Sequence, residues 1–194
     1  MAGGTFPPLD MASPSGDALP TVAVVAAELR ASTGDRTKPR PDGLLGLLRD
    51  LHDTNLAQWD LEDRARERGG GDAAVADAKR AIDVLNTRRH GVVEAVDAAI
   101  DHAVTQRMSA TPSTESPGMA FDRLSVLIIR THHTQVAARD DSVEGGLEAR
   151  LPLLHTQLRV LEEAIEALLG EICTGTKRFL PHQSLKLYGR EVGR

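Results

Sequence analysis

Eight leucines and isoleucines follow one another at alternating spacings of four and three residues, and this repeat restricts the fold strongly. They are Leu147, Leu151, Leu154, Leu158, Leu161, Ile165, Leu168 and Ile172. The spacing places them along one side of an α-helix and is typical of helices that pack at a shallow angle. Pro152 predicts a kink or a late start of this helix, and Gly175 predicts its end.

Three earlier helices are predicted by apolar periodicity and by the residues at their ends. Gly69-Gly70-Gly71 separates the first two, and Ser116-Pro117 is a typical start for the third. The predicted ranges are 44–68, 72–106 and 117–138. Because four helices with short connections pack as an up-down bundle, we expect an all-α, antiparallel four-helix bundle over residues 44–175.

The two ends of the chain differ in composition from this region. Residues 1–43 contain much of the proline and glycine, so we expect a flexible leader in which residues 22–30 can form one short helix. Residues 176–194 form a basic, mostly non-periodic tail.

The composition excludes several classes of protein. Aromatic residues make up 3% of the chain, so the core must consist of Leu, Val, Ile and Ala, which favours helix packing. The net charge of −5 argues against a nucleic-acid partner, because proteins that bind the phosphate backbone are usually basic. The single cysteine, Cys173, excludes an internal disulfide framework and a cysteine-rich zinc site. We predict no cofactor.

No membrane partner is expected either. No segment reaches the roughly 18 uninterrupted apolar residues of a membrane span. The first mostly apolar run, residues 19–27, is short and has no Lys or Arg before it, unlike a secretory signal. The sequence therefore predicts a cytoplasmic protein.

Polar residues occupy several positions where the helical periodicity calls for apolar ones. On the first helix these are Asn55 and Glu62, with Trp59 between them; on the second, Arg89 and Asn86, flanked by Lys79, Asp83, His90, Glu94 and Asp97; on the third, Ser125 and His132, with Asp122 and His133 on the adjacent line. Burying an unpaired charge is costly, so such residues must be paired or functional.

Two interpretations of these residues remain open. In the structural one, Arg89 pairs with Glu62 or Asp63, and Asn55 and Asn86 complete the hydrogen bonds that fix the register of the bundle. In the functional one, the same residues line a polar pocket inside the bundle, where four-helix proteins often place their sites.

Metal and hydrolase chemistry find little support. Di-metal bundles use Glu-x-x-His, which the chain lacks, and the adjacent His132 and His133 point about 100° apart on a helix. Ser125, His133 and Asp122 lie on one predicted helix, whereas a catalytic triad needs side chains that converge from different elements.

The cations of the tail have two interpretations as well. They are Lys177, Arg178, Lys186 and Arg190, with Tyr188 among them. They can stabilise the carboxyl end of the preceding helix, or they can form a clamp for a phosphate or carboxylate.

Four blocks of the sequence resemble the domain of unknown function 4254 family, in the same order. They are Trp59-Asp60-Leu61-Glu62-Asp63; Lys79-Arg80-Ala81-Ile82-Asp83 with Asn86, Arg89 and Glu94; Thr114-Glu115-Ser116-Pro117 with Asp122-Arg123-Leu124-Ser125 and His133; and Lys177-Arg178 with Gln183, Lys186 and Tyr188. The resemblance implies a helical fold and a bacterial origin, without an established reaction. Some members lie near polysaccharide biosynthesis genes, which suggests sugar or nucleotide-sugar metabolism.

The chain departs from the family pattern at three places. Gly91 stands where the family usually has an aspartate, and His132 where it has an aromatic residue. The usual Asn-Asp-Pro stretch after the tail motif is missing. A role that needs that aspartate is therefore not expected here.

We expect, as the leading hypothesis, a small anionic metabolite bound in a polar pocket inside the bundle, in an enzyme or enzyme accessory of glycan or specialised metabolism. Arg89 would hold the anion, helped by Lys79 and Lys186, and Glu62, Asp83 and His133 would be the acid/base groups. The remaining predicted ligand-binding residues are Asn55, Trp59, Asn86, Asp122, Ser125 and Tyr188. The alternative is a structural or interaction bundle whose leucine repeat forms a homodimer.

Overall fold

The computed structural model of the chain describes residues 19–67, 72–140 and 146–183. These residues contain five α-helices, one short 3-10 helix and two strands of two residues each. The elements are α1 (Val22–Gly34), α2 (Gly43–Glu67), α3 (Asp72–Ala103), β1 (Thr111–Pro112), α4 (Pro117–Ala137), η1 (Leu147–Arg150), α5 (Leu151–Cys173) and β2 (Lys177–Arg178). The prediction of an all-α fold is confirmed, and α1 lies where one short helix was predicted in addition to the four long ones.

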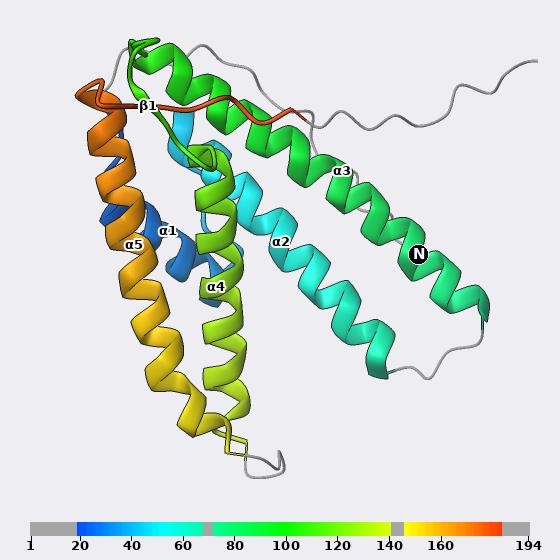
Figure 1. The fold of residues 1–194 in the computed structure, drawn as a ribbon. Helices are drawn as coiled ribbons and strands as arrows, with labels where there is room; N and C mark the ends of the chain where they lie inside the picture. Colours follow the sequence, from blue (N-terminus) through cyan, green and yellow to red (C-terminus); the bar gives the residue numbers. More distant parts are fainter. Residues whose placement is uncertain (1–18, 68–71, 141–145, 184–194) are drawn as a thin grey trace, which may run out of the picture.

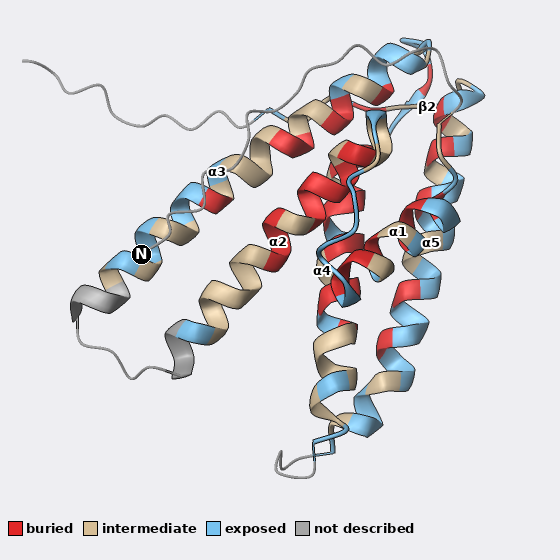
Figure 2. Ribbon diagram, turned by 180° about the vertical axis from the view of Figure 1, so that it is seen from behind, coloured by how far each residue is buried: buried red, intermediate tan, exposed pale blue. Residues whose placement is uncertain are grey.

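The four long helices form two antiparallel hairpins, α2–α3 and α4–α5 (Figure 1). The hairpins come together at the end of the molecule that holds β1, and they diverge toward the opposite end, where α2 and α4 end. Helix α1 crosses between them, beside α4 and α5 on one side and α2 on the other (Figures 1 and 2).

Helix α1 belongs to the core, although it lies within the range predicted as a leader. Val22, Val25 and Leu29, spaced three and four residues apart, are buried in the main apolar cluster. The backbone N–H of Val22 donates to the carboxylate of Glu166 on α5 at 2.9 Å. This apolar face is buried because α1 closes the space between the two hairpins.

The helix ends follow the predicted signals closely. A 3-10 turn precedes Pro152, and α5 begins at Leu151, so the predicted late start is confirmed. At the other end, Gly175 has a φ of 71°; its N–H donates to the carbonyl of Ile172, and that of Thr176 to the carbonyl of Glu171. This pair of bonds is the Schellman motif, and its left-handed residue favours glycine.

The segment after α5 returns to the other hairpin. β2 pairs in parallel with β1, Thr111 opposite Lys177. The pairing directs Phe179 into the apolar cluster, where its side chain is buried. The first residues of the predicted tail are therefore part of the fold.

Burial declines along the α2–α3 hairpin toward its turn (Figure 2). On α3, Leu85, Val93 and Ile100 are buried, whereas Ala78 and Ile82, on the same stripe, are only half-buried. The hairpins diverge there, so α3 has α2 as a neighbour but not α4. No helix in the described ranges combines the length and apolarity that a membrane crossing requires.

Candidate functional site

A chain of hydrogen-bonded side chains runs through the core and joins α1, α2 and α4. Thr33 Oγ1 lies 2.8 Å from His52 Nε2, and His52 Nδ1 lies 2.9 Å from Ser125 Oγ. The amide of Asn55 donates to Ser125 Oγ at 3.0 Å and to Asp122 Oδ1 at 2.9 Å. All five side chains are buried. The chain therefore connects α1, α2 and α4 through polar groups that solvent does not reach.

The donor and acceptor of each hydrogen bond to His52 follow from the hydrogen bond that Thr33 makes to the backbone. Thr33 donates its hydroxyl proton to the carbonyl of Leu29, so it must accept from His52 Nε2–H. His52 Nδ1 is then the acceptor for the hydroxyl of Ser125. Burial, with Arg49 and Arg36 nearby, lowers the pKa of His52 to about 3, so the ring is neutral at ordinary pH.

The pairing of Ser125 with His52 has the donor order of an activated serine but not its accessibility. Both side chains are completely buried, so no substrate can approach the hydroxyl. The hydrogen-bonded side chains therefore hold the helices in place, and the Ser125 hydroxyl does not act as a nucleophile. His52 is not among the residues predicted from the sequence, although its spacing of four from Leu48 and three from Asn55 places it on the apolar line of α2.

Arg89 on α3 extends this chain through an ion pair with Asp122. Its Nε lies 3.0 Å from each carboxylate oxygen, and its Nη2 lies 2.6 Å from Oδ2. The Asp122 side chain is 3% exposed and that of Arg89 28%. The partner of Arg89 is thus on α4, and not Glu62 or Asp63 on α2 as the structural interpretation supposed. Arg89 lies level with Asn55, which binds the same carboxylate, whereas Glu62 lies about two helical turns farther along α2.

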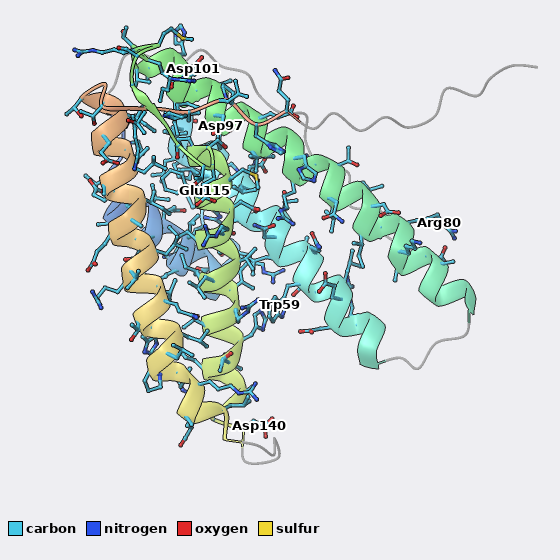
Figure 3. The ribbon with its side chains drawn as sticks, viewed as in Figure 1. Trp59, Arg80, Asp97, Asp101, Glu115 and Asp140 are labelled. Atoms are coloured by element: carbon cyan, nitrogen blue, oxygen red, sulfur yellow. The ribbon has the colours of Figure 1, made fainter. Side chains whose placement is uncertain are left out.

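Trp59 lies toward the diverging end of the hairpins, between α2 and α4 (Figure 3). Its ring stacks on His133, with centroids 5.0 Å apart and planes 16° apart. The indole Nε1 is buried, and no group in the described ranges accepts a hydrogen bond from it. Burial, followed by the nearby His132, lowers the pKa of His133, so this stack favours a neutral imidazole.

The other predicted site residues lie apart from these two groups. Glu62 accepts a hydrogen bond from Gln58 at 3.1 Å. Asn86 on α3 is half-buried, and Lys79 and Asp83 are exposed on the same helix. Lys186 and Tyr188 fall outside the described residues. The structure therefore brings together Asn55, Arg89, Asp122 and Ser125 in one group, and Trp59 and His133 in another.

A second ionic network, which the sequence analysis also overlooked, joins α1, α2 and α3. Arg49, with a 2% exposed side chain, donates to Asp53 at 2.9 Å and to Glu28 at 2.7 Å. The neighbouring Asp50 accepts from Arg88 at 2.8 Å. Arg49 and Asp50 are buried within the network, so we assign it a structural role.

Asp97 on α3 holds the start of α4 and the segment after β2. Its Oδ1 accepts from the backbone N–H of Gly118 at 2.7 Å, and its Oδ2 from that of His182 at 2.8 Å. A Cβ atom at Gly118 would lie 2.7 Å from the carbonyl oxygen of Val93 and 2.8 Å from Asp97 Oδ1. Only glycine fits this close approach of α4 to α3.

Histidines and carboxylates do not gather into a metal site in the part of the chain that the structure describes. His90, one of the polar residues that flank Arg89 on α3, stacks on His182, and its Nδ1 lies 3.3 Å from His182 Nε2. A pair of imidazoles provides two ligands at most, which is fewer than protein metal sites normally use.

A groove of about 730 Å³ lies on the outer face of α4 and α5, with Arg89 and Asp122 at its edge. The apolar part of its lining, called its apolar floor below, consists of Val126, Leu127, Val160, Leu161 and Ala164. The charged part, called its rim, consists of Arg123, Arg130 and Glu115. The groove is of the size and mixed character that small-molecule sites have.

Comparison with known proteins places the chain in a family. Residues 46–180 match the model of the family described as "Protein of unknown function (DUF4254)". The chain belongs to the DUF4254 family. No curated protein and no solved structure matches it.

The span matched by the DUF4254 model begins within α2 and ends just after β2. It includes His52, Asn55, Arg89, Asp122 and every residue that lines the groove. Helix α1 lies before it, although α1 completes the core and supplies Thr33 at one end of the buried chain. In this member of the DUF4254 family, the core therefore extends beyond the matched span.

Proposed function

We propose that this DUF4254 protein binds a small anionic molecule with an apolar portion in the groove between α4 and α5. The observation that supports this proposal is the combination of three guanidinium groups with an apolar floor in one groove. Arg130 supplies the net positive charge, because Arg89 and Arg123 are each paired with a carboxylate. Guanidinium groups recognise carboxylates and phosphates through charge-assisted hydrogen bonds.

The charges of the groove distinguish the roles of the three arginines. Arg89 pairs with Asp122, and Arg123 donates to Glu115 at 2.7 Å. Arg130 is exposed, and no ion pair to it occurs within the described ranges. The sequence predicts Arg89 as the anion-binding residue, but Asp122 already balances the charge of Arg89. Arg130 is therefore the anchor for the anion, and Arg89 with Asp122 forms a polar edge of the same groove.

The apolar floor selects the rest of the ligand. Val160 is 51% exposed, although it lies in the groove beside Leu161 and Ala164. Covering such side chains with an apolar ligand is favourable by about 25 cal/mol per Å² of buried area. A ligand that combines one anionic group with an alkyl or ring portion satisfies both features, whereas inorganic anions satisfy only one.

The structural interpretation is retained for a different set of residues. His52, Asn55, Ser125 and Asp122 are buried and hydrogen-bonded to one another, as devices that fix helix register are. The binding function rests on the exposed rim of the groove.

The test uses octanoate and octyl phosphate as probes and octanol as the uncharged comparison, with binding measured by calorimetry and by thermal shift. The two anions should bind and octanol should bind at least about tenfold more weakly, because hydrogen bonds to charged groups contribute roughly 1.5–3 kcal/mol. Arg130→Gln should weaken the anions to the level of octanol. Arg139→Gln is the matched control, since Arg139 is exposed and does not line the groove. Equal affinity for octanol and octanoate, or no effect of Arg130→Gln, would refute the proposal.

A further inference from the structure

The groove between α4 and α5 offers different polar groups along its length. On α4 its lining runs from Asp122, which Arg89 contacts, to Arg130. These two positions are eight residues apart, so their backbones lie about 12 Å apart along the helix axis. Val126 and Leu127 of the apolar floor lie between them. A short ligand held by Arg130 therefore does not reach the end of the groove where Arg89 lies.

The guanidinium of Arg89 keeps hydrogen-bond donors that its pairing with Asp122 does not use. Arginine has five N–H groups in a fixed planar arrangement. Nε and Nη2 of Arg89 donate to Asp122, whereas Nη1 makes no hydrogen bond within the described ranges. The Arg89 side chain is 28% exposed and lines the groove. The edge formed by Nη1 and the second N–H of Nη2 can therefore donate to a ligand in the groove.

The orientation of this edge is fixed before any ligand binds. Two Arg89 nitrogens contact the Asp122 carboxylate, and that carboxylate is buried and also accepts from Asn55 at 2.9 Å. A donor held in this way loses little conformational freedom on binding, which favours affinity.

The charges at this end of the groove decide which group the edge of Arg89 accepts. Asp122 balances Arg89 and Glu115 balances Arg123, so these lining groups leave no net positive charge for a second anion. A second carboxylate on the ligand would also face the carboxylates of Asp122 and Glu115. A neutral acceptor, such as a hydroxyl or carbonyl oxygen, receives the hydrogen bonds of Arg89 without that repulsion.

We propose that the ligand of this groove carries a neutral hydrogen-bond acceptor at the end of its apolar chain opposite the anion. Arg130 binds the anion and Arg89 binds the acceptor. The ligand class is that of hydroxy or oxo acids, or the corresponding phosphates, whose apolar chain spans about 12 Å. This inference rests on the binding function proposed above and adds its specificity: Arg130 sets the affinity for every anion, and Arg89 selects among chains by their far end.

The test compares decanoate with 10-hydroxydecanoate, which is long enough to span the groove, by calorimetry on the wild-type protein. The hydroxy acid should bind at least about fivefold more tightly, because its oxygen accepts from a charged donor. Without such a donor the order reverses, since burying an unbonded hydroxyl group is costly. Decanedioate should bind more weakly than 10-hydroxydecanoate. Hexanoate and 6-hydroxyhexanoate, which are too short to reach Arg89 from Arg130, should not differ in this way.

Variants assign the preference to Arg89. Arg89→Lys keeps a positive charge beside Asp122 but removes the planar edge, so the preference for the hydroxy acid should fall below about twofold. Arg36→Lys is the matched control, since Arg36 pairs with Asp60 outside the groove, and it should retain the wild-type preference. Arg130→Gln should weaken decanoate and 10-hydroxydecanoate by the same factor.

The outcomes distinguish this inference from the proposed function. If decanoate binds through Arg130 but the hydroxyl group adds no affinity, the role assigned to Arg89 is wrong and the anion site stands. An unchanged preference in Arg89→Lys also overturns that role. If none of these acids binds, both the function and the inference are refuted. The comparison of acids on the wild-type protein decides the matter even where Arg89→Lys fails to fold.

Discussion

Replacing Arg89 with methionine tests how the buried chain is held together. The substitution roughly conserves volume and removes a guanidinium that makes three hydrogen bonds to Asp122. The carboxylate then retains one bond, from Asn55 at 2.9 Å. Because the Asp122 side chain is only 3% exposed, its charge stays in the core without an opposite charge beside it.

The size of the effect follows from the burial of the two partners. Removing one member of a buried ion pair costs about 3–5 kcal/mol of stability. The Arg89 side chain is 28% exposed, so water can reach part of the vacated space, and we expect the lower end of that range, about 3 kcal/mol. For a chain of 194 residues this corresponds to a melting temperature lower by roughly 6–12 °C.

A double-mutant cycle, with the free energy of unfolding measured by urea titration or calorimetry, gives the contribution of the ion pair between Arg89 and Asp122 itself. Asp122→Asn keeps the shape of the side chain, removes its charge and still accepts from Asn55. The double variant should therefore recover at least about 1.5 kcal/mol of the loss. Arg123→Met is the control, since its ion pair with Glu115 is largely exposed and should contribute below about 1 kcal/mol. An Arg89→Met protein as stable as the wild type, or no recovery in the double variant, would refute this account.

Further predictions concern pH and close packing. Because burial, with two neighbouring arginines, lowers the pKa of His52 to about 3, the unfolded chain binds a proton that the folded chain excludes between about pH 6.5 and 3. Stability should fall on acidification in that window by up to about 1.4 kcal/mol per pH unit, and urea unfolding at pH 7, 6 and 5 should show a shallower slope for His52→Gln. Protonated imidazole quenches indole emission, and the pKa of His133 is lowered. The fluorescence of Trp59 should therefore decrease at a pH below the ordinary histidine pKa of 6.5. A midpoint at or above pH 6.5, or a transition that survives His133→Gln, would contradict the stacking assignment. Gly118→Ala should destabilise the protein by at least about 2 kcal/mol through overlap with α3. Gly170→Ala, where the added methyl group meets nothing within 4 Å, should stabilise it by up to about 1 kcal/mol. Thermal melts of the two variants measure both changes.

Much of the fold could be predicted from local signals. The boundaries of α2, α4 and α5 depend on residues within one turn of each helix end, such as Pro152 and Gly175, and these signals are legible without knowledge of the rest of the chain. The apolar residues Phe121, Leu124 and Ile128 of α4, which are spaced three and four residues apart, are buried. The placement of α1 could not be predicted in the same way, because its apolar face is explained only by the space between two hairpins that lie later in the sequence.

The candidate site likewise contains residues that the sequence identifies and one that it does not. Periodicity identified Asn55, Arg89, Asp122 and Ser125 as polar residues on inward-facing positions, and the structure places all four in one hydrogen-bonded group. Periodicity could not identify Arg130, because an exposed arginine on the outer face of a helix follows the ordinary amphipathic pattern. The role proposed for Arg130 depends on the tertiary structure, because the apolar part of the groove is formed by side chains of both α4 and α5.

The sequence by itself determined which residues are helical and which side of each helix is apolar, because both properties repeat within a few residues of the same helix. Tertiary structure alone decided which carboxylate meets Arg89 and which hydroxyl meets His52. Those partners depend on how far one helix is shifted along and rotated about its axis relative to the next. That shift and rotation are set by the packing of the entire interface, so a displacement of one turn, about 5.4 Å, would give every buried polar group a different partner.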